Sequence, residues 1–230
     1  TMKLAAFFSG GKDSAYAIYD AKKSGHIIQV LFTILPKSDE SHLLHFPNID
    51  QTKIQSESMN IPQIIQHIDS IKPDIEELKL NELIKKAKKT FDFEGIIHGG
   101  ISSMYQKEKF ENLCQDNNLT LISPIWQRNA ELYMKDLLEH GFEFIITSVS
   151  SDGLDQSWLG KKIGYSELSD LQNLSKKFQF NLNFEGGEAE TFVINCPLFK
   201  NKIKIINSNK IWDGIRGRFE IVGAKLENNA

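Results

Sequence analysis

The sequence predicts an α/β fold with a doubly wound, mostly parallel sheet, followed by a smaller strand-rich lobe. Short apolar runs alternate with segments of helical spacing over the first half of the chain, as in parallel sheets covered by helices on both faces. The first apolar run ends in a glycine pair, at the position where such sheets bind ligands. Beyond Trp126 the apolar runs become more strand-like and turn-rich, which indicates a change of architecture.

The first three expected elements form a strand–helix–strand unit. Leu4 to Phe8 is a continuous apolar run, which is typical of a fully buried parallel strand. From Asp13 the apolar residues follow helical spacing, and Gly25 ends that helix. The next strand covers 27–35 and ends at Pro36. We expect the crossover between the two parallel strands to be right-handed.

The alternation continues to about residue 122. A polar loop over 37–48 precedes a further helix that ends at Met59. The next expected strands are 64–68, 95–98 and 119–122, and the next helices are 76–89 and 106–117. The first of these two helices is strongly charged, and we expect Leu78, Leu83 and Ile84 to be available for its buried face.

The last hundred residues contain more strands. Expected helices cover 130–140 and 168–178, and expected strands cover 144–149, 191–194, 202–206 and 219–226. A soft boundary at Trp126 therefore divides the chain into domains 1–126 and 127–230.

Composition excludes several classes of protein. With 40% hydrophobic and 25% charged residues, the chain is typical of a globular protein with a sizeable core, and no apolar stretch approaches the length of a membrane span. The net charge of −3 gives no general attraction to nucleic acid or to anionic membranes. Cys114 and Cys196 are too far apart for a CxxC pair, which favours a reducing compartment and a cytoplasmic location.

The segment Ser9-Gly10-Gly11-Lys12-Asp13-Ser14 lies between the first strand and the first helix. Helix N-termini at this edge of a parallel sheet present unpaired N–H groups. Gly10 and Gly11 let the backbone adopt positive φ and approach a phosphate without a Cβ in the way. Successive N–H groups can then form an anion cradle.

The other side chains of this loop suit a polyphosphate. Ser9 and Ser14 add hydroxyl donors, and Lys12 adds a mobile positive charge. Asp13 repels a phosphate, so we expect it to cap the helix or to help hold a Mg²⁺ ion that bridges phosphates. The alternative is a glycine-rich turn that caps a helix and binds no ligand.

The spacing of the loop differs from that of the common P-loop, which places four residues between its first glycine and Gly-Lys. The loop resembles the PP-loop of the ATP pyrophosphatase superfamily. That resemblance implies a fold like the adenine nucleotide alpha hydrolases, with ATP and Mg²⁺ bound in domain 1–126. It also implies cleavage of ATP between the α- and β-phosphates, with Ser9, Gly10, Gly11, Lys12, Asp13 and Ser14 holding the pyrophosphate.

Further segments are similar to the diphthine–ammonia ligase family, in family order from Ser9 to about Phe199. They are Asp39-Glu40-Ser41 with His45 and Asn48, Ile61-Pro62, Ser103-Met104-Tyr105-Gln106-Lys107, Pro124-Ile125-Trp126-Gln127-Arg128, Gly153-Leu154-Asp155, Leu159-Gly160-Lys161, Glu185-Gly186-Gly187-Glu188-Ala189-Glu190-Thr191-Phe192 and Cys196-Pro197-Leu198-Phe199. Two positions depart from the pattern: Ala189 replaces a usual aromatic residue, and Asn195 replaces a common Asp.

The resemblance implies amidation of the carboxylate of diphthine, a modified histidine of translation elongation factor two. Ammonium would be the nitrogen donor, and the products would be diphthamide, AMP and pyrophosphate. Domain 127–230 would bind the acceptor. Substrate-binding residues would be Ser103, Tyr105, Gln106, Gly186, Gly187 and Thr191. The chain would work without membrane or nucleic acid, and it could form a homodimer.

We expect Lys12 and three carboxylates, Glu185, Glu188 and Glu190, to be catalytic. Adenylation makes a carboxylate a good electrophile, but ammonium must still be collected and deprotonated. Clustered carboxylates can collect the cation, and one with a raised pKa can remove the proton. Glu188 and Glu190 would share a face if the strand over 191–194 extends back to them. The alternative is a solvated Gly-Gly hairpin with charged flanks.

Three other functions stay open at this point. The chain could amidate another carboxylate, since Ala189 changes the motif. It could be a tRNA-modifying PP-loop enzyme, although Cys114 and Cys196 lack the partners that thiolation needs and the surface charge is not basic. It could be a nucleotide sensor that does not turn ATP over. Measuring AMP after incubation with ATP and the acceptor would distinguish a sensor from a ligase. The cysteines also lack the context of a glutaminase, so free ammonium is the expected donor.

Overall fold

The computed structural model describes residues 1–36, 47–68 and 72–228. The chain forms two compact units. The first unit comprises Thr1–Ser9, Asp13–Ile49 and Asn60–Trp126, and the second comprises Gly10–Lys12, Asp50–Met59 and Gln127–Ala230. The roles of nucleotide-binding and acceptor-binding domain remain predictions.

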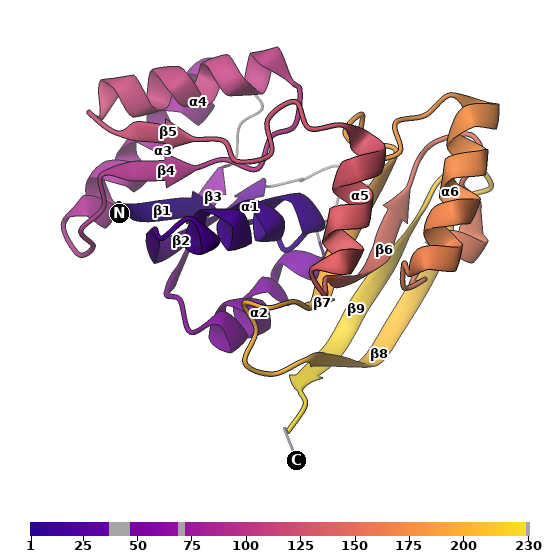
Figure 1. Ribbon diagram of the computed structural model, residues 1–230. Coiled ribbons are helices and arrows are strands. Elements are labelled where there is room, and N and C mark those ends of the chain that lie inside the picture. The colour runs from indigo at the N-terminus through magenta and orange to yellow at the C-terminus, as the bar shows by residue number, and fades with distance from the viewer. Residues whose placement is uncertain (37–46, 69–71, 229–230) are drawn as a thin grey trace. The chain divides into compact units, whose positions relative to one another are not determined.

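The first unit contains a five-stranded parallel sheet with the order β3-β2-β1-β4-β5 (Figure 1). Its strands are β1 (Lys3–Phe7), β2 (Ile27–Pro36), β3 (Gln63–Ile68), β4 (Gly95–Ile97) and β5 (Thr120–Ile122). The direction of the sheet order reverses between β1 and β4. Because ligands of open parallel sheets bind at the carboxyl end of such a reversal, the glycine loop after β1 has the expected position.

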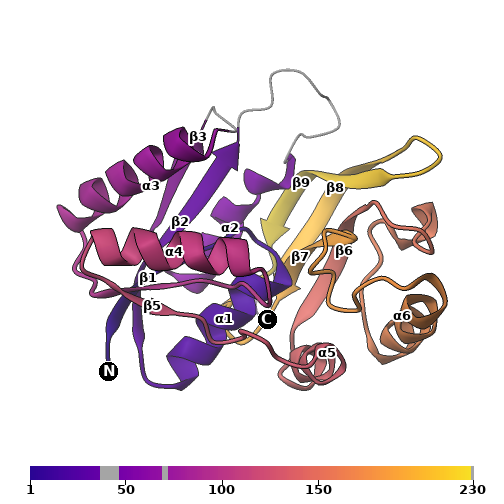
Figure 2. The same cartoon turned by 90° about the horizontal axis from the view of Figure 1, so that it is seen from above.

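Helices cover both faces of this sheet. Figure 2 shows α3 (Pro73–Lys88) and α4 (Met104–Asp116) on one side and α1 (Lys12–Lys23) on the other. Phe32 and Ile96 of the sheet pack in one hydrophobic core with Leu83 and Ile84 of α3. The prediction of a doubly wound parallel sheet is thus confirmed.

One expected core residue of α3 is exposed. Leu78 is 57% accessible, whereas Leu80, Leu83, Ile84 and Ala87 are buried. The helix begins at Pro73, earlier than predicted, because proline suits the first turn, where its missing N–H has no partner to lose. The buried stripe follows the i, i+3, i+4, i+7 spacing from Leu80, and Leu78 lies outside that stripe.

The second unit contains a four-stranded antiparallel sheet with the order β7-β6-β9-β8. Its strands are β6 (Glu143–Val149), β7 (Ala189–Asn195), β8 (Ile203–Trp212) and β9 (Gly217–Leu226). The strand-rich lobe is confirmed, but β8 continues well beyond the predicted end at residue 206. Its second half is polar and exposed, so pairing with β9, not an apolar pattern, maintains that part of the strand.

The helices of this unit are α2 (Thr52–Met59), α5 (Ala130–Glu139) and α6 (Tyr165–Phe178), with short 3-10 turns at Pro47–Ile49 in the first unit and Gln156–Trp158 in the second. Asn129 caps α5 by accepting a hydrogen bond from the N–H of Leu132 at 3.1 Å. Helix α2 packs against β9, far from it in sequence. No helix in the described ranges is long and apolar enough to cross a membrane.

Candidate active site

The base of the glycine loop is closed by hydrogen bonds within the first unit. The N–H of Ser9 donates to Oγ of Ser14 at 3.1 Å, and the two hydroxyl oxygens are 3.3 Å apart. The carbonyl of Phe8 accepts from the hydroxyl of Thr33 at 2.7 Å. The loop therefore leaves β1 and enters α1 through a fixed turn. Asp13 lies in the first turn of the helix, where its negative charge interacts favourably with the helix dipole.

The end of β4 packs directly on the start of α1. A Cβ built on Gly99 would lie 3.0 Å from both N and Cα of Ser14, so only glycine fits without displacing the helix. The neighbouring His98 is buried and packs on Phe110, with ring centroids 4.2 Å apart. Burial and the nearby charge of Lys109 lower the pKa of His98 to about 4, against a hydrogen bond with Gln106. It is a neutral core histidine at physiological pH.

The tip of the loop, Gly10–Lys12, runs along the open edge of β7 in the second unit. The carbonyl of Gly10 accepts from the N–H of Val193 at 3.0 Å, and the N–H of Lys12 donates to Oγ1 of Thr191 at 3.0 Å. Nε2 of Gln55 on α2 donates to the carbonyls of Gly10 at 3.0 Å and Val193 at 2.8 Å. Thr191, predicted to bind substrate, thus contacts the loop backbone.

The side chain of Lys12 is 2% exposed and reaches the turn before the carboxylate motif. Its ammonium donates to the carbonyl of Asn183 at 2.6 Å and lies 5.6 Å from the ring centroids of Tyr133 and Phe184. Phe184 has φ of 62°, a strained conformation for a bulky residue. The structure thereby brings the lysine of the glycine loop to a segment 171 residues away in sequence.

The three carboxylates lie on one short stretch but differ in environment. Oε2 of Glu188 accepts from the N–H of Asn181 at 2.6 Å, while its buried Oε1 has no hydrogen-bond partner within the described part of the chain. Glu190 is exposed overall, yet desolvation of its carboxyl raises its pKa. The N–H of Glu185 donates to Oδ1 of Asn183 at 3.1 Å. Because β7 begins at Ala189, strand alternation does not extend to Glu188 and the condition for a shared face is not met.

Gly186 and Gly187 form the exposed turn between these carboxylates. The N–H of Gly187 donates to the carbonyl of Phe184 at 3.1 Å, and its carbonyl accepts from the hydroxyl of Ser150 at 2.8 Å. The N–H of Ser150 also donates to the carbonyl of Glu188 at 2.9 Å. The end of β6 therefore supports the turn on one side.

Comparison with known families matches nearly the whole chain. The diphthamide synthase N-terminal domain matches residues 2–121, and the diphthamide synthase C-terminal domain matches residues 129–226. The chain belongs to the diphthamide synthase family. The curated relatives named diphthine–ammonia ligase include those of Rattus norvegicus, 34% identical, and Bos taurus, 35% identical, each over 91% of this chain and 85% of the relative. The ligase of Schizosaccharomyces pombe is 30% identical over 91% of this chain but 37% of its own length.

A solved structure, the U34-tRNA thiolase NcsA from Methanococcus maripaludis with its [4Fe-4S] cluster, is 18% identical with a TM-score of 0.40. The match covers 82% of this chain and 70% of the thiolase. At that similarity it says nothing further about this chain. Membership of the diphthamide synthase family, a family of ligases, rests on the domain matches and the curated relatives.

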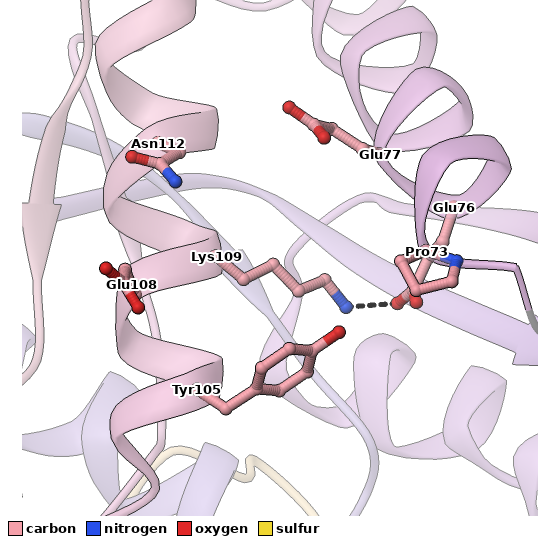
Figure 3. A pocket seen from close by; sticks show the side chains of 7 residues that line it. All are labelled: Pro73, Glu76, Glu77, Tyr105, Glu108, Lys109 and Asn112. Carbon is pink, nitrogen blue, oxygen red and sulfur yellow. Dashed lines mark hydrogen bonds and ion pairs between the residues drawn. The ribbon is translucent and has the colours of Figure 1, made fainter.

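The family motif near Ser103 lies in the first unit. Ser103 caps α4 by accepting from the N–H of Gln106 at 3.3 Å, and the side chain of Gln106 bonds to His98. Tyr105 is 66% exposed at the rim of a pocket of about 190 Å³ between α3 and α4. Figure 3 shows an ion pair between Lys109 and Glu76 across this pocket. These contacts hold α4 in place, and the substrate-binding roles of Ser103, Tyr105 and Gln106 stay predictions.

One segment of the family resemblance cannot be placed in the structure, and the predicted Mg²⁺ site stays a prediction. Asp39, Glu40, Ser41 and His45 lie outside the described residues. Within the described ranges, no group of three or more His, Cys, Asp or Glu side chains could hold a metal ion. Asp13 stays the predicted protein ligand of a Mg²⁺ ion that binds with the phosphates.

Three residues that matter here were missed by sequence reasoning. Gln55 and Asn183 contact the loop only through the tertiary fold. Glu143 forms ion pairs with Lys162 and Lys202, and it accepts from Nδ2 of Asn195 at 2.8 Å. An aspartate in place of Asn195 would bring a second carboxylate to Glu143 and would lose the hydrogen bond that the amide donates.

Proposed function

We propose that this protein amidates the carboxylate of diphthine on translation elongation factor two, using ATP and ammonium. The observation that carries the proposal is the contact of Lys12 with the carbonyl of Asn183. It joins the glycine loop, which suits pyrophosphate, to the turn that bears Glu185 and Glu188. Two motifs with complementary chemistry are thus connected by one side chain.

The first step is adenylation. An oxygen of the acceptor carboxylate attacks the α-phosphorus of ATP, the bond to the bridging oxygen breaks, and pyrophosphate leaves with the electron pair. The N–H groups of the loop and the ammonium of Lys12 stabilise the charge that grows on pyrophosphate. A Mg²⁺ ion held by the phosphates and Asp13 would neutralise further charge.

The second step is amide formation. The buried Oε1 of Glu188, which has no hydrogen-bond partner among the described residues, attracts an ammonium ion, because the cation supplies a charge-assisted hydrogen bond. Glu190, whose pKa is raised by desolvation, accepts a proton from ammonium. Ammonia then attacks the acyl carbon, AMP leaves with the electrons of the carbon–oxygen bond, and the nitrogen releases one proton to water.

A second acceptor class is supported by Ala189. This residue is 5% exposed at the start of β7, where the family pattern has an aromatic side chain. An alanine beside Glu188 and Glu190 fills less space than an aromatic residue would, so a small-molecule carboxylate is the alternative acceptor. The tRNA-modifying and sensor alternatives lose support, because the curated relatives are named diphthine–ammonia ligase.

Mass spectrometry of elongation factor two before and after incubation with the enzyme, ATP and ammonium tests the proposal. We expect the mass change of carboxylate to amide, together with AMP. Lys12→Ala should reduce AMP formation about a hundredfold or more, as for loss of a transition-state donor. Glu188→Gln should retain acyl-adenylate formation and slow amide formation. If Glu188→Gln matches the wild type in both steps, the carboxylate assignment is wrong.

A further inference from the structure

Gln55 is a buried polar residue without a role in the chemistry described above. It lies on α2 and is inaccessible to solvent. Its Nε2 donates to two carbonyls, those of Gly10 and Val193, which establishes the orientation of the amide. Its Oε1 then has no partner among the residues that the structure describes. Leaving a buried acceptor unpaired costs free energy, which the two donated hydrogen bonds must offset.

The two donated hydrogen bonds determine the direction of one peptide group. In a loop that binds an anion through N–H groups, each carbonyl must point away from the anion. The carbonyl of Gly10 is held away by two donors, the N–H of Val193 at 3.0 Å and Nε2 of Gln55 at 3.0 Å. Because C=O and N–H point to opposite sides of a trans peptide, this also sets the direction of the N–H of Gly11.

A peptide between two glycines needs such a restraint more than others do. Without a Cβ on either side, rotation of the peptide meets little steric resistance. Gly10 already has φ of +85°, and a Cβ there would lie 2.7 Å from Oε1 of Gln55, so the amide also occupies the space beside this glycine. A rotated peptide would turn the carbonyl of Gly10 toward the phosphates and repel them.

We infer that Gln55 is a positioning residue for the phosphate loop, which locks the Gly10–Gly11 peptide with its N–H toward the pyrophosphate. The inference rests on the proposed function, because that function assigns the loop to pyrophosphate. Gln55 touches no reacting atom. It acts through the backbone of Gly10 and ties it to the strand that carries Thr191 and Glu190.

The test compares Gln55→Met, which keeps the length of the side chain but removes both donated bonds, with Ser58→Ala. Ser58 lies on the same helix and bonds to the backbone of Asn201 at 2.6 and 3.0 Å, so its variant controls for the packing of α2. Titration calorimetry without acceptor measures binding of MgATP and of inorganic pyrophosphate. Hydrogen exchange of the nucleotide-free proteins measures the amides of residues 8–14 and of Val193.

We expect Gln55→Met to weaken binding of both ligands about tenfold, as for loss of one to two net hydrogen bonds, and to speed exchange in residues 8–14. The KM for ATP should rise more than kcat falls. Ser58→Ala should stay within about twofold of the wild type in binding. Equal binding by Gln55→Met and wild type, or an equal loss in Ser58→Ala, would overturn the inference.

Two further outcomes keep the test decisive. If Gln55→Met does not fold, the wild-type protein still decides: an amide of Val193 that exchanges at the unprotected rate contradicts the lock, and a protected one supports it. If the wild type binds ATP but does not amidate elongation factor two, the acceptor proposal fails while the ratio of affinities still measures the lock.

Discussion

The ammonium of Lys12 contacts a protein carbonyl in the structure and would contact a phosphate in the proposed reaction. It donates to the neutral carbonyl of Asn183, at 2.6 Å. A phosphate oxygen offers a charge-assisted bond, which is roughly twice as strong as a neutral one, and lysine can reorient its flexible stem. Bound nucleotide would therefore compete with Asn183 for the ammonium, and the turn that carries Glu185 and Glu188 would respond to that exchange.

Glu143 forms a charge network that takes no part in the proposed reaction. Burial would raise its pKa, but hydrogen bonds from Lys162, Asn195 and Lys202 outweigh burial and hold the pKa at about 2. A carboxyl with a lowered pKa in the folded state stabilises the fold above its unfolded pKa of about 4.5, and this stabilisation is lost as pH falls toward 2.

Replacing Glu143 with Gln should therefore lower the free energy of unfolding in a pH-dependent way. We expect a loss of about 1 kcal/mol at pH 7, since both lysines are partly exposed and screened by solvent. The loss should shrink between pH 4.5 and 2, as measured by urea unfolding. Glu82→Gln, which removes an exposed ion pair with Lys79, should change little at any pH. A loss independent of pH would contradict this account.

Among the elements of the first unit, the end of β4 packs closely on the start of α1. The end of β4 places Gly99 against the backbone of Ser14, which cannot move without displacing the first turn of α1. The geometry of that turn in turn sets the base of the glycine loop through the bond from Ser9 to Ser14. Packing of one strand end thus affects the segment that is predicted to bind phosphate.

Gly99→Ala should disturb both stability and nucleotide binding. Its Cβ would lie 3.0 Å from backbone atoms of Ser14, so we expect a loss of about 1–3 kcal/mol in the free energy of unfolding and weaker binding of ATP. Gly223→Ala is the matched control, because its Cβ would meet nothing nearer than 3.8 Å. Urea unfolding and calorimetry measure the two effects. Equal behaviour of both variants would disprove the role of this contact.

The order of elements could be predicted from the sequence because local patterns determine it. The apolar run from Leu4 to Phe8 and the helix after the glycine pair follow from burial and spacing alone. The prediction that Leu78 belongs to the buried face was wrong, because the buried stripe of a charged helix depends on its packing partners. The contact between Lys12 and Thr191 spans 179 residues and could not be predicted, since nothing local in either segment points to the other.

At the scale of the whole molecule, the second unit is discontinuous in sequence. Besides Gln127–Ala230 it includes Gly10–Lys12 and Asp50–Met59, which come from the first third of the chain. Nε2 of Gln51 donates to the carbonyl of Ile221 at 3.3 Å, and the carbonyl of Ser58 accepts from the N–H of Lys200 at 2.8 Å. A linear boundary at Trp126 therefore separates segments that fold together.

This organisation predicts the behaviour of a nicked protein. We expect a protease site inserted after Gln127 to yield, once cut, two fragments that elute together in gel filtration, because α2 stays bound to the C-terminal fragment by buried side chains and hydrogen bonds. The nicked protein should also keep its affinity for ATP, since the partners of Gly10 and Lys12 remain in place. Ser58→Ala in the nicked protein should lower the urea concentration at which the fragments separate, because it removes two of those bonds. Fragments that separate without denaturant would show that these contacts are too weak to hold the unit together.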